Sequence, residues 1–332
     1  MQKTKLGQRG PEASVIGLGC MGMSDFYGPA DESESIATVH NALDSGVTLL
    51  DTGDFYGMGA NELLLRKALQ GRKREDFLLS VKFGAMRDPS NAMIGVDCRP
   101  NSVKNFLTYS LKRLGTDYID IYRPARVDPS VPIEETIGAI SDMVRAGYVR
   151  FVGLSEAGGE TVRRASAVHP IVDLQIEYSI LSRGIESGLL SVCRELGVGI
   201  TAYGVLSRGL LSGKWSSGNP AGPKDMRGHF PRFSPGNFDR NLSLVDSLKA
   251  IAHSKGCTVA QLAVSWVLSR GRDILPLIGA RTRAQLRESL AASTVELSPA
   301  EIALIEKSIP PGAVAGERYG PQQMKMLDSE RG

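Results

Sequence analysis

The sequence predicts a (β/α)8 barrel of the TIM type, and three observations support this fold class. Short apolar runs and segments of helical period alternate about eight times along the 332 residues, as strands and covering helices of a barrel do. The short runs are apolar on both faces, which is typical of strands buried in a parallel sheet. Glycine accounts for 37 residues and gathers at the ends of these runs, where tight turns need it.

The strands are expected in a regular order along the chain. An N-terminal hairpin comes first, with KTKL and ASVIGLG as its strands and GQRG as its turn. The barrel strands are then expected at Val15–Gly19, Thr48–Asp51, Leu78–Lys82, Tyr118–Tyr122, Phe151–Leu154, Leu174–Ile176, Gly199–Tyr203 and Ile274–Ile278.

Helices are expected where apolar side chains recur every three or four residues. The clearest are Ser33–Ser45, Ser102–Leu114, Ile133–Ala146 and Val259–Ser269. No linker or change of composition divides the chain, so we expect one domain over residues 1–332, with 310–332 as a loop or tail. A doubly wound sheet has the same periodicity and remains the alternative arrangement.

One stretch breaks this rhythm. Trp215–Asn237 is too long and too rich in glycine and proline for a simple connection, which predicts a functional or a disordered loop. In a barrel it follows the seventh strand, at the face where barrels place their active sites.

Composition excludes several classes of function. Lys and Arg total 39 against 36 Asp and Glu, a net charge of +3 that does not favour a nucleic-acid partner. The four cysteines lie far apart without a CxxC pair, so we expect neither a metal site nor disulfides. We find no signal-peptide pattern and no apolar run of the ~18 residues that a membrane span needs. These features predict a cytoplasmic protein that acts on a small molecule, and they leave homo-oligomer formation open.

Three residues around the second and third strands are candidates for catalysis. Asp51 ends one strand, Tyr56 lies just beyond it, and Lys82 stands in an apolar run. A buried lysine needs a partner or a function, because an unpaired buried ammonium is strongly disfavoured. A tyrosine hydroxyl beside it would have a lowered pKa and could donate a proton. The alternative is a structural Asp51–Lys82 ion pair, with Tyr56 as an aromatic at the rim.

Eight segments occur in the order seen in aldo-keto reductases. They are MQKTKLGQRGPEASVIGLGCMGM, DTGDFYG, SVKFG, YIDIYRPARVDP, GLSEAG, DLQIEYS, ITAYGVLSRGLLSGK and PLIGARTRAQLRESLAA, and the resemblance covers Thr4 to about Ile309. Many separate motifs in one order are far more specific than a single short motif. The chain therefore resembles the bacterial and plant branch of this superfamily. The resemblance implies a (β/α)8 barrel that binds NADPH at its C-terminal face without a Rossmann domain.

The resemblance also implies a catalytic set of Asp, Tyr, Lys and His, and the chain departs from it at one position. Asp51, Tyr56 and Lys82 match the first three, whereas Ala125 stands where the family usually has His. Losing one donor to a developing oxyanion typically costs ~2.7–4 kcal/mol. Three readings stay open: a competent reductase in which water or Arg126 fills the gap, a weak generalist, or a cofactor-binding protein. Strand alternation predicts that Arg126 points away from Ala125.

On the cofactor side, the resemblance places Ser155 and Gln175 at the nicotinamide carboxamide and Tyr203 against the ring, with Glu156 replacing the usual Asn. It places Arg281 at the adenosine 2′-phosphate, and a phosphate there would balance cations at a helix N-terminus. We therefore expect NADPH or NADP+ as cofactor. The cofactor-binding residues implied are Met21, Asp51, Ser155, Gln175, Tyr203, Gly204, Leu206, Arg208, Gly279, Arg281, Gln285, Glu288 and Ser289.

The resemblance implies reduction of aldehydes or activated ketones to alcohols, with Tyr56 as proton donor. The expected substrate walls are Met23, Phe26, Phe83, Ala125 and Arg126. One alternative is an NADPH-binding sensor or regulatory subunit with little turnover. The other is a reductase of a conjugated C=C bond. No motif in the sequence identifies the substrate.

Overall fold

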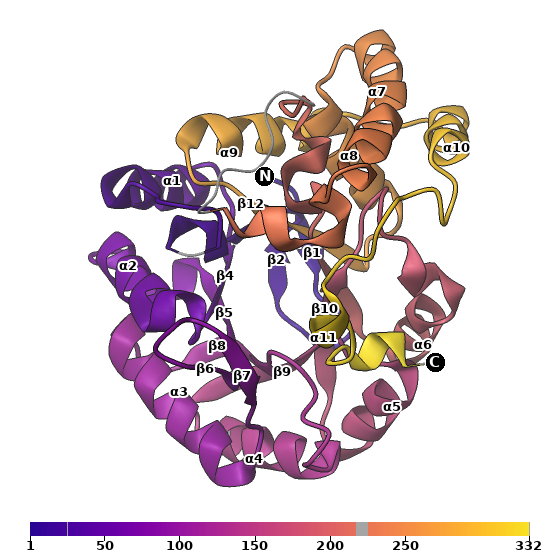
Figure 1. Ribbon diagram of the computed structural model, residues 1–332. Coiled ribbons are helices and arrows are strands. Elements are labelled where there is room, and N and C mark those ends of the chain that lie inside the picture. Colours follow the sequence, from indigo (N-terminus) through magenta and orange to yellow (C-terminus); the bar gives the residue numbers. More distant parts are fainter. Residues whose placement is uncertain (25, 217–224, 332) are drawn as a thin grey trace.

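Eight parallel strands close into a barrel in the computed structural model, which describes residues 1–24, 26–216 and 225–331 (Figure 1). Strand β12 pairs with β3, so the sheet has no open edge. This closure confirms the predicted fold class and excludes the doubly wound sheet. The barrel strands are β3 (Gly17–Gly19), β4 (Leu49–Gly53), β5 (Leu78–Phe83), β8 (Ile119–Pro124), β9 (Val149–Ser155), β10 (Ile171–Glu177), β11 (Gly199–Tyr203) and β12 (Ile274–Gly279).

The predicted N-terminal hairpin is present and lies against the amino-terminal end of the barrel. Its strands are β1 (Lys3–Lys5) and β2 (Glu12–Ser14), which pair antiparallel. In the turn, the backbone N–H of Gln8 donates to the carbonyl of Gly197, 2.8 Å away. Gly7 has a φ of +65°, and a Cβ there would lie 2.2 Å from the carbonyl oxygen of Val172. Only glycine, which lacks a Cβ, lets the hairpin backbone approach the barrel so closely. The packing of the hairpin on the barrel therefore requires glycine at position 7.

Helices surround the barrel and cover its outer face (Figure 1). All four helices expected from the sequence are present, with ends within two residues of the predicted ones. The helices are α1 (Glu32–Asp44), α2 (Ala60–Leu69), α3 (Pro100–Leu114), α4 (Ile133–Arg145), α5 (Gly159–Val168), α6 (Leu189–Leu196), α7 (Asn237–Lys255), α8 (Val259–Ser269), α9 (Arg283–Leu290), α10 (Pro299–Ser308) and α11 (Pro321–Met324).

Local sequence explains where these helices begin and end. Thr258 and Gln261 form a reciprocal capping box at the start of α8, which satisfies two backbone N–H groups that lack a partner within the helix. Gly115 ends α3 in the left-handed conformation that glycine adopts at low cost. The inner faces of the helices pack on the strands, and Trp266 of α8 is fully buried in that layer.

The carboxyl ends of the strands carry the irregular segments. Among them are the 3-10 turns η1 (Met21–Met23), η2 (Tyr56–Gly59) and η5 (Ser207–Ser212), a small hairpin of β6 (Ala85–Arg87) and β7 (Met93–Val96), and the segment 310–331 with α11 and η9 (Asp328–Glu330). Of the loop expected at Trp215–Asn237, residues 217–224 lie outside the described part of the chain. The remainder forms η6 (Met226–His229) and η7 (Pro231–Phe233), and His229 is exposed there.

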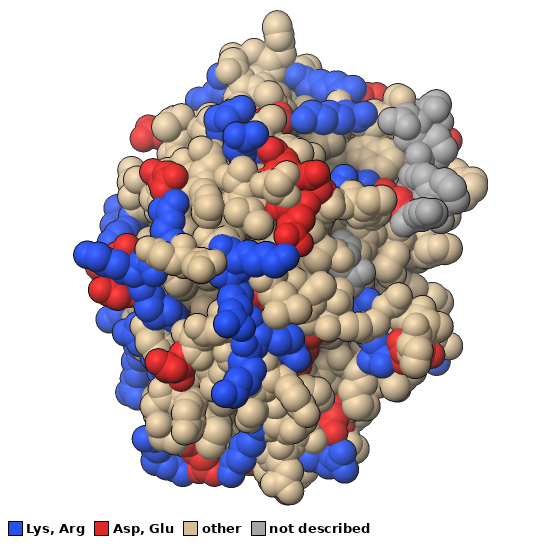
Figure 2. Space-filling view, turned by 90° about the vertical axis from the view of Figure 1, so that its left-hand side faces the viewer, with Lys and Arg blue, Asp and Glu red and all other residues tan. Residues whose placement is uncertain are grey.

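Surface charge is mixed in sign. Figure 2 shows Lys and Arg interspersed with Asp and Glu over the face formed by α1 to α3. None of the helices within the described residues has the length and apolar character needed to cross a membrane.

Candidate active site

The centre of the candidate site is an ion pair inside the barrel, between Lys82 of β5 and Asp51 of β4. Both side chains are almost completely buried. The second carboxylate oxygen of Asp51 accepts hydrogen bonds from Ser80 Oγ and from Gln175 Nε2, each at 2.8 Å. Asp51 therefore accepts from three donors on two strands, β5 and β10, and these bonds fix the position of the Lys82 ammonium.

The ring of Tyr56 lies next to the Lys82 ammonium of this pair. The Lys82 Nζ atom is 5.1 Å from the centroid of the Tyr56 ring, within cation–π range. Burial raises the pKa of Tyr56 well above its ordinary value, and the negative charge of Asp51 raises it further. Burial also lowers the pKa of Lys82, against the opposing effect of Asp51.

These pKa shifts correct one expectation. The sequence argument predicted that Lys82 would lower the pKa of Tyr56, but the pKa is raised. The reason is that the Lys82 charge is paired with Asp51 and that the Tyr56 hydroxyl is withdrawn from water. Tyr56 is therefore protonated at neutral pH, as a proton donor must be.

A second buried ion pair continues from this centre through the barrel interior. Arg123 of β8 lies 3.0 Å from Asp173 of β10, and both side chains are fully buried. Arg123 Nη2 also donates to Ser80 Oγ at 3.0 Å. Because that oxygen accepts from Arg123, its own proton is directed to Asp51. Gly153 leaves the space for this pair, since a Cβ there would lie 2.5 Å from Asp173 Oδ1.

Ala125 and Arg126 follow the end of β8, and Arg126 does not point away as expected. Its side chain folds back, and Nη1 donates to the carbonyl oxygen of Ala125 at 2.6 Å. Strand alternation fails here because β8 ends at Pro124, so the next two residues belong to a loop. The Arg126 guanidinium therefore lies beside Ala125, whose side chain is only a methyl group.

The sequence analysis missed a group of residues from the C-terminal segment. Arg318 forms a buried ion pair with Glu156 at the end of β9, with N–O distances of 2.8 and 2.5 Å. Tyr319 Oη lies 2.9 Å from Tyr203 Oη. Ser329 donates to Glu156 from further along. In Figure 1 the yellow C-terminal segment crosses the view of the barrel near β10. No signal in the sequence pointed to these residues, because the segment lacks a motif.

The residues expected at the nicotinamide come together at the ends of neighbouring strands. Ser155 and Gln175 are paired in register between β9 and β10, and both are buried. Tyr203 ends the next strand, β11, and its hydroxyl donates to Glu156 at 2.7 Å. The following loop has a left-handed backbone at Gly204 and, within η5, at Ser207, Arg208 and Gly209.

The residues expected at the adenosine phosphate lie at the start of α9. The Arg281 guanidinium donates to the backbone carbonyl of Tyr27 at 2.9 Å, and within residues 1–24, 26–216 and 225–331 it has no carboxylate partner. The backbone N–H of Arg281 donates to the side-chain oxygen of Gln285. Glu288 pairs with Lys214 across the loop. Ser289, in contrast, is buried. Of the expected residues on α9, only Gln285 and Glu288 are accessible.

The expected substrate walls divide into two groups. Phe26 packs edge-to-face against Tyr56, with ring centroids 6.1 Å apart. Met21 and Met23 lie in η1 beside them, and Met23 is buried. Phe83, in contrast, is fully buried and stacks on Tyr122, with centroids 4.3 Å apart. It follows Lys82 in β5 and so faces the helices, where it contributes to the core.

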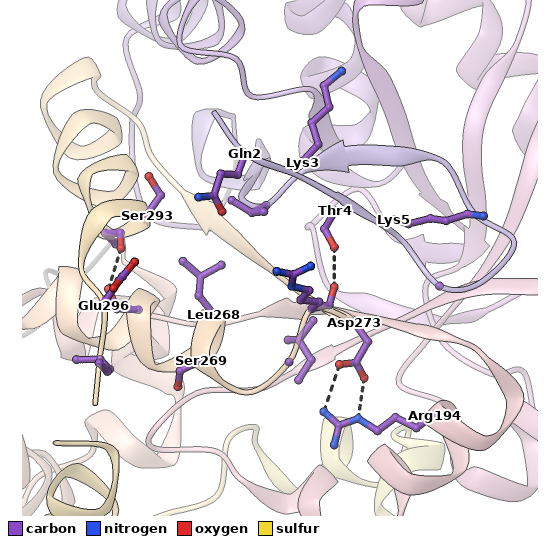
Figure 3. A pocket seen from close by; sticks show the side chains of 18 of the residues that line it. Gln2, Lys3, Thr4, Lys5, Arg194, Leu268, Ser269, Asp273, Ser293 and Glu296 are labelled. Carbon is purple, nitrogen blue, oxygen red and sulfur yellow. Dashed lines mark hydrogen bonds and ion pairs between the residues drawn. The ribbon is translucent and has the colours of Figure 1, made fainter. Parts of the chain in front are cut away.

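A hollow lined by both polar and apolar side chains lies at the opposite, amino-terminal end of the barrel (Figure 3). It includes the first residues of β1 and the turn before β12. Thr4 donates to the carbonyl of Arg272 at 2.6 Å, and Arg194 Nε donates to Asp273 at 2.7 Å. These groups satisfy one another, and the candidate active site lies at the other end of the barrel. Among the described residues, no cluster of three His, Cys, Asp or Glu side chains is arranged to hold a metal ion.

Comparison with known proteins identifies the family. The model of the "Aldo/keto reductase family" matches residues 15–310. The chain belongs to the aldo/keto reductase family. It is 40% identical over 320 residues to the "Probable aldo-keto reductase 1" of Glycine max, covering 96% of this chain and 92% of that one. The family consists of NAD(P)-dependent oxidoreductases.

Solved structures of other aldo/keto reductases share the fold. The glycerol dehydrogenase AKR11B4 from Gluconobacter oxydans superposes with a TM-score of 0.84 at 27% identity, covering 92% of this chain and 94% of that one. The aldo-keto reductase AKR11C1 from Bacillus halodurans, in its holo form, gives a TM-score of 0.78 at 28% identity, covering 93% and 96%.

The residues present fit a dinucleotide of this kind. A phosphate could neutralise Arg281, which contacts only uncharged carbonyl oxygens among the described residues.

Proposed function

We propose that this aldo/keto reductase uses NADPH to reduce aldehydes or activated ketones to alcohols, with Tyr56 as proton donor. The observation that carries the proposal is the position of Tyr56 over Lys82, itself paired with Asp51, at the carboxyl ends of β4 and β5. NADPH, when bound, supplies the hydride that reaches the carbonyl carbon.

The chain's own residues handle the proton. Tyr56 transfers its phenolic proton to the carbonyl oxygen as that atom gains negative charge. The Lys82 ammonium, held by Asp51, then stabilises the tyrosinate that remains. Burial strengthens this charge–charge attraction because little water screens it.

The cofactor is held by the groups at the barrel mouth. Ser155 and Gln175 are proposed to bind the nicotinamide carboxamide and Tyr203 to support the ring. Arg281, at the N-terminus of α9, is proposed to bind the 2′-phosphate and so to favour NADPH over NADH.

Substitution of Tyr56 tests the proposal. We expect Tyr56→Phe to lower kcat by about 10²-fold or more, as loss of a general acid does, with NADPH binding unchanged by fluorescence titration. NADPH consumption is measured by absorbance with aldehydes, ketones and enones. Tyr148→Phe is the control, because Tyr148 is exposed.

The outcomes distinguish the alternatives. Unchanged turnover in Tyr56→Phe would refute its role as proton donor. Saturable NADPH binding by the wild type without turnover of any carbonyl would favour a sensor. Product analysis separates reduction of a carbonyl from reduction of a conjugated C=C bond.

A further inference from the structure

Arg126 has an unusual environment for a charged side chain. It is only partly exposed, and its guanidinium contacts two uncharged oxygens, the Ala125 carbonyl at 2.6 Å and Tyr319 Oη at 3.4 Å. Within the described part of the chain, no carboxylate lies at ion-pairing distance from it. A guanidinium withdrawn from water without a counter-ion is unfavourable.

The neighbouring arginines differ from Arg126 in this respect. Arg318 is paired with Glu156 and with Glu330. Arg208 and Arg232 both lie near Glu177, at 3.6 and 3.2 Å. Glu156 and Glu177 are thus already engaged by other arginines, so Arg126 retains a charge that an incoming anion can neutralise.

The donors and acceptors around Tyr319 leave its oxygen free to accept a hydrogen bond from the Arg126 guanidinium. Burial raises the pKa of Glu156, but the hydrogen bonds and charge of Arg318 outweigh it and lower that pKa to about 2, so Glu156 is ionised and only accepts. Tyr203 therefore gives its single phenolic proton to Glu156. In the 2.9 Å contact between the two tyrosines, Tyr319 must then be the donor. A lone pair of Tyr319 is left to accept from Arg126.

Arg126 lies next to the strand that carries Lys82, since the N–H of Ala125 donates to the Phe83 carbonyl at 2.8 Å. The positive charge of Arg126 is among those that act on the Tyr56 hydroxyl, where it lowers the pKa against the larger effect of burial. A guanidinium has five N–H donors, and Arg126 makes only two hydrogen bonds within the described residues, besides a contact with the Tyr319 ring at 5.7 Å from its centroid. The remaining donors are available for a carboxylate, which guanidinium groups bind with two parallel hydrogen bonds.

We propose that Arg126, positioned by Tyr319, binds a carboxylate of the substrate, and that the enzyme prefers carbonyl compounds that also carry a carboxylate. Arg126 follows β8 and Lys82 lies near the end of β5, and these two strands are neighbours in the barrel, so an anion held by Arg126 lies at the same mouth as the proposed proton donor. This inference rests on the proposed carbonyl reduction and names its substrate class.

The test uses two substrates that differ only in charge, benzoylformate and its methyl ester. We expect Arg126→Gln to raise KM for benzoylformate roughly 10- to 100-fold, as loss of charge-assisted hydrogen bonds predicts, with a much smaller effect on the ester. Tyr319→Phe removes the oxygen that holds Arg126 and should raise the same KM about 3- to 10-fold. Arg163→Gln alters an exposed ion pair on α5 and should change the KM for neither substrate.

Calorimetric titration of benzoylformate into the protein, with and without NADP+, gives a readout independent of turnover. Binding by the wild type that is lost in Arg126→Gln supports the anion site even if neither compound is reduced. The inference would be overturned if the ratio of the KM for benzoylformate to the KM for its ester were the same in the wild type and in Arg126→Gln. Absence of benzoylformate binding would also overturn it. Reduction of the ester alone keeps the proposed carbonyl reduction and rejects the preference for acids, so the two proposals can fail separately.

Discussion

At the scale of single residues, the barrel interior is organised by charge. Lys82 and Arg123 alternate in space with Asp51 and Asp173, and Ser80 links the two pairs. Buried ion pairs of this kind are weak evidence for stability, because desolvation offsets much of the attraction. Their geometry matters more here, since Arg123 sets the direction of the Ser80 hydrogen bond to Asp51.

Removing Arg123 alone should therefore be much worse than removing the whole pair. We expect Arg123→Leu to lower the free energy of unfolding by about 3–5 kcal/mol, because Asp173 stays buried without its counter-ion. Adding Asp173→Leu should recover most of that loss. Urea unfolding of both variants measures the difference, and a double variant no more stable than the single one would contradict this account.

At the scale of elements, the C-terminal segment is part of the face that carries the candidate active site. Arg318 reaches Glu156, 162 positions earlier in the chain, and Ser329 and Glu330 contact the same pair. A segment with one four-residue helix is held by this buried network. The barrel mouth therefore depends on residues far from it in sequence.

Breaking this pair should loosen the segment and change the response to pH. Arg318→Met leaves Glu156 buried and unpaired, which should cost about 3–5 kcal/mol at pH 7. The folded pKa of Glu156, about 2, lies below its ordinary 4.5. The charged form therefore stabilises the fold above about pH 4.5, and this contribution is lost as the pH falls toward 2.

The difference in stability between Arg318→Met and the wild type should accordingly shrink on acidification. Denaturant unfolding at pH 7 and at pH 3 measures it, with limited proteolysis as a probe of the segment. A difference that stays constant with pH would argue against the pair. Arg163→Gln serves again as the exposed control.

At the scale of the whole molecule, the closed barrel brings together groups from nearly the full length of the chain. The candidate cofactor residues come from β9, β10, β11 and the start of α9, and the catalytic ones from β4, η2 and β5. A ligand that joins these parts binds only the folded state, so it must raise the unfolding temperature.

We expect NADP+ to stabilise the protein more than NAD+ does at equal concentration. At 100 times its Kd a ligand contributes about 2.7 kcal/mol, a shift of a few degrees in Tm. In Arg281→Gln, NADP+ should raise the Tm no more than NAD+ does. Arg283→Gln is the matched control, because Arg283 is already paired with Glu34. Equal shifts for both dinucleotides in the wild type would reject the preference.

The sequence by itself determined the order of strands and four helices, because the period of apolar residues and the glycine turns act locally. It also predicted the Asp51–Lys82 pair, since a lysine in an apolar strand needs a counter-ion. Only the tertiary structure showed that Arg126 folds back beside Ala125 and meets Tyr319, 193 positions away. Such contacts depend on where a strand ends and on a segment without a pattern. The pKa of Tyr56 likewise follows from burial, which the barrel as a whole decides.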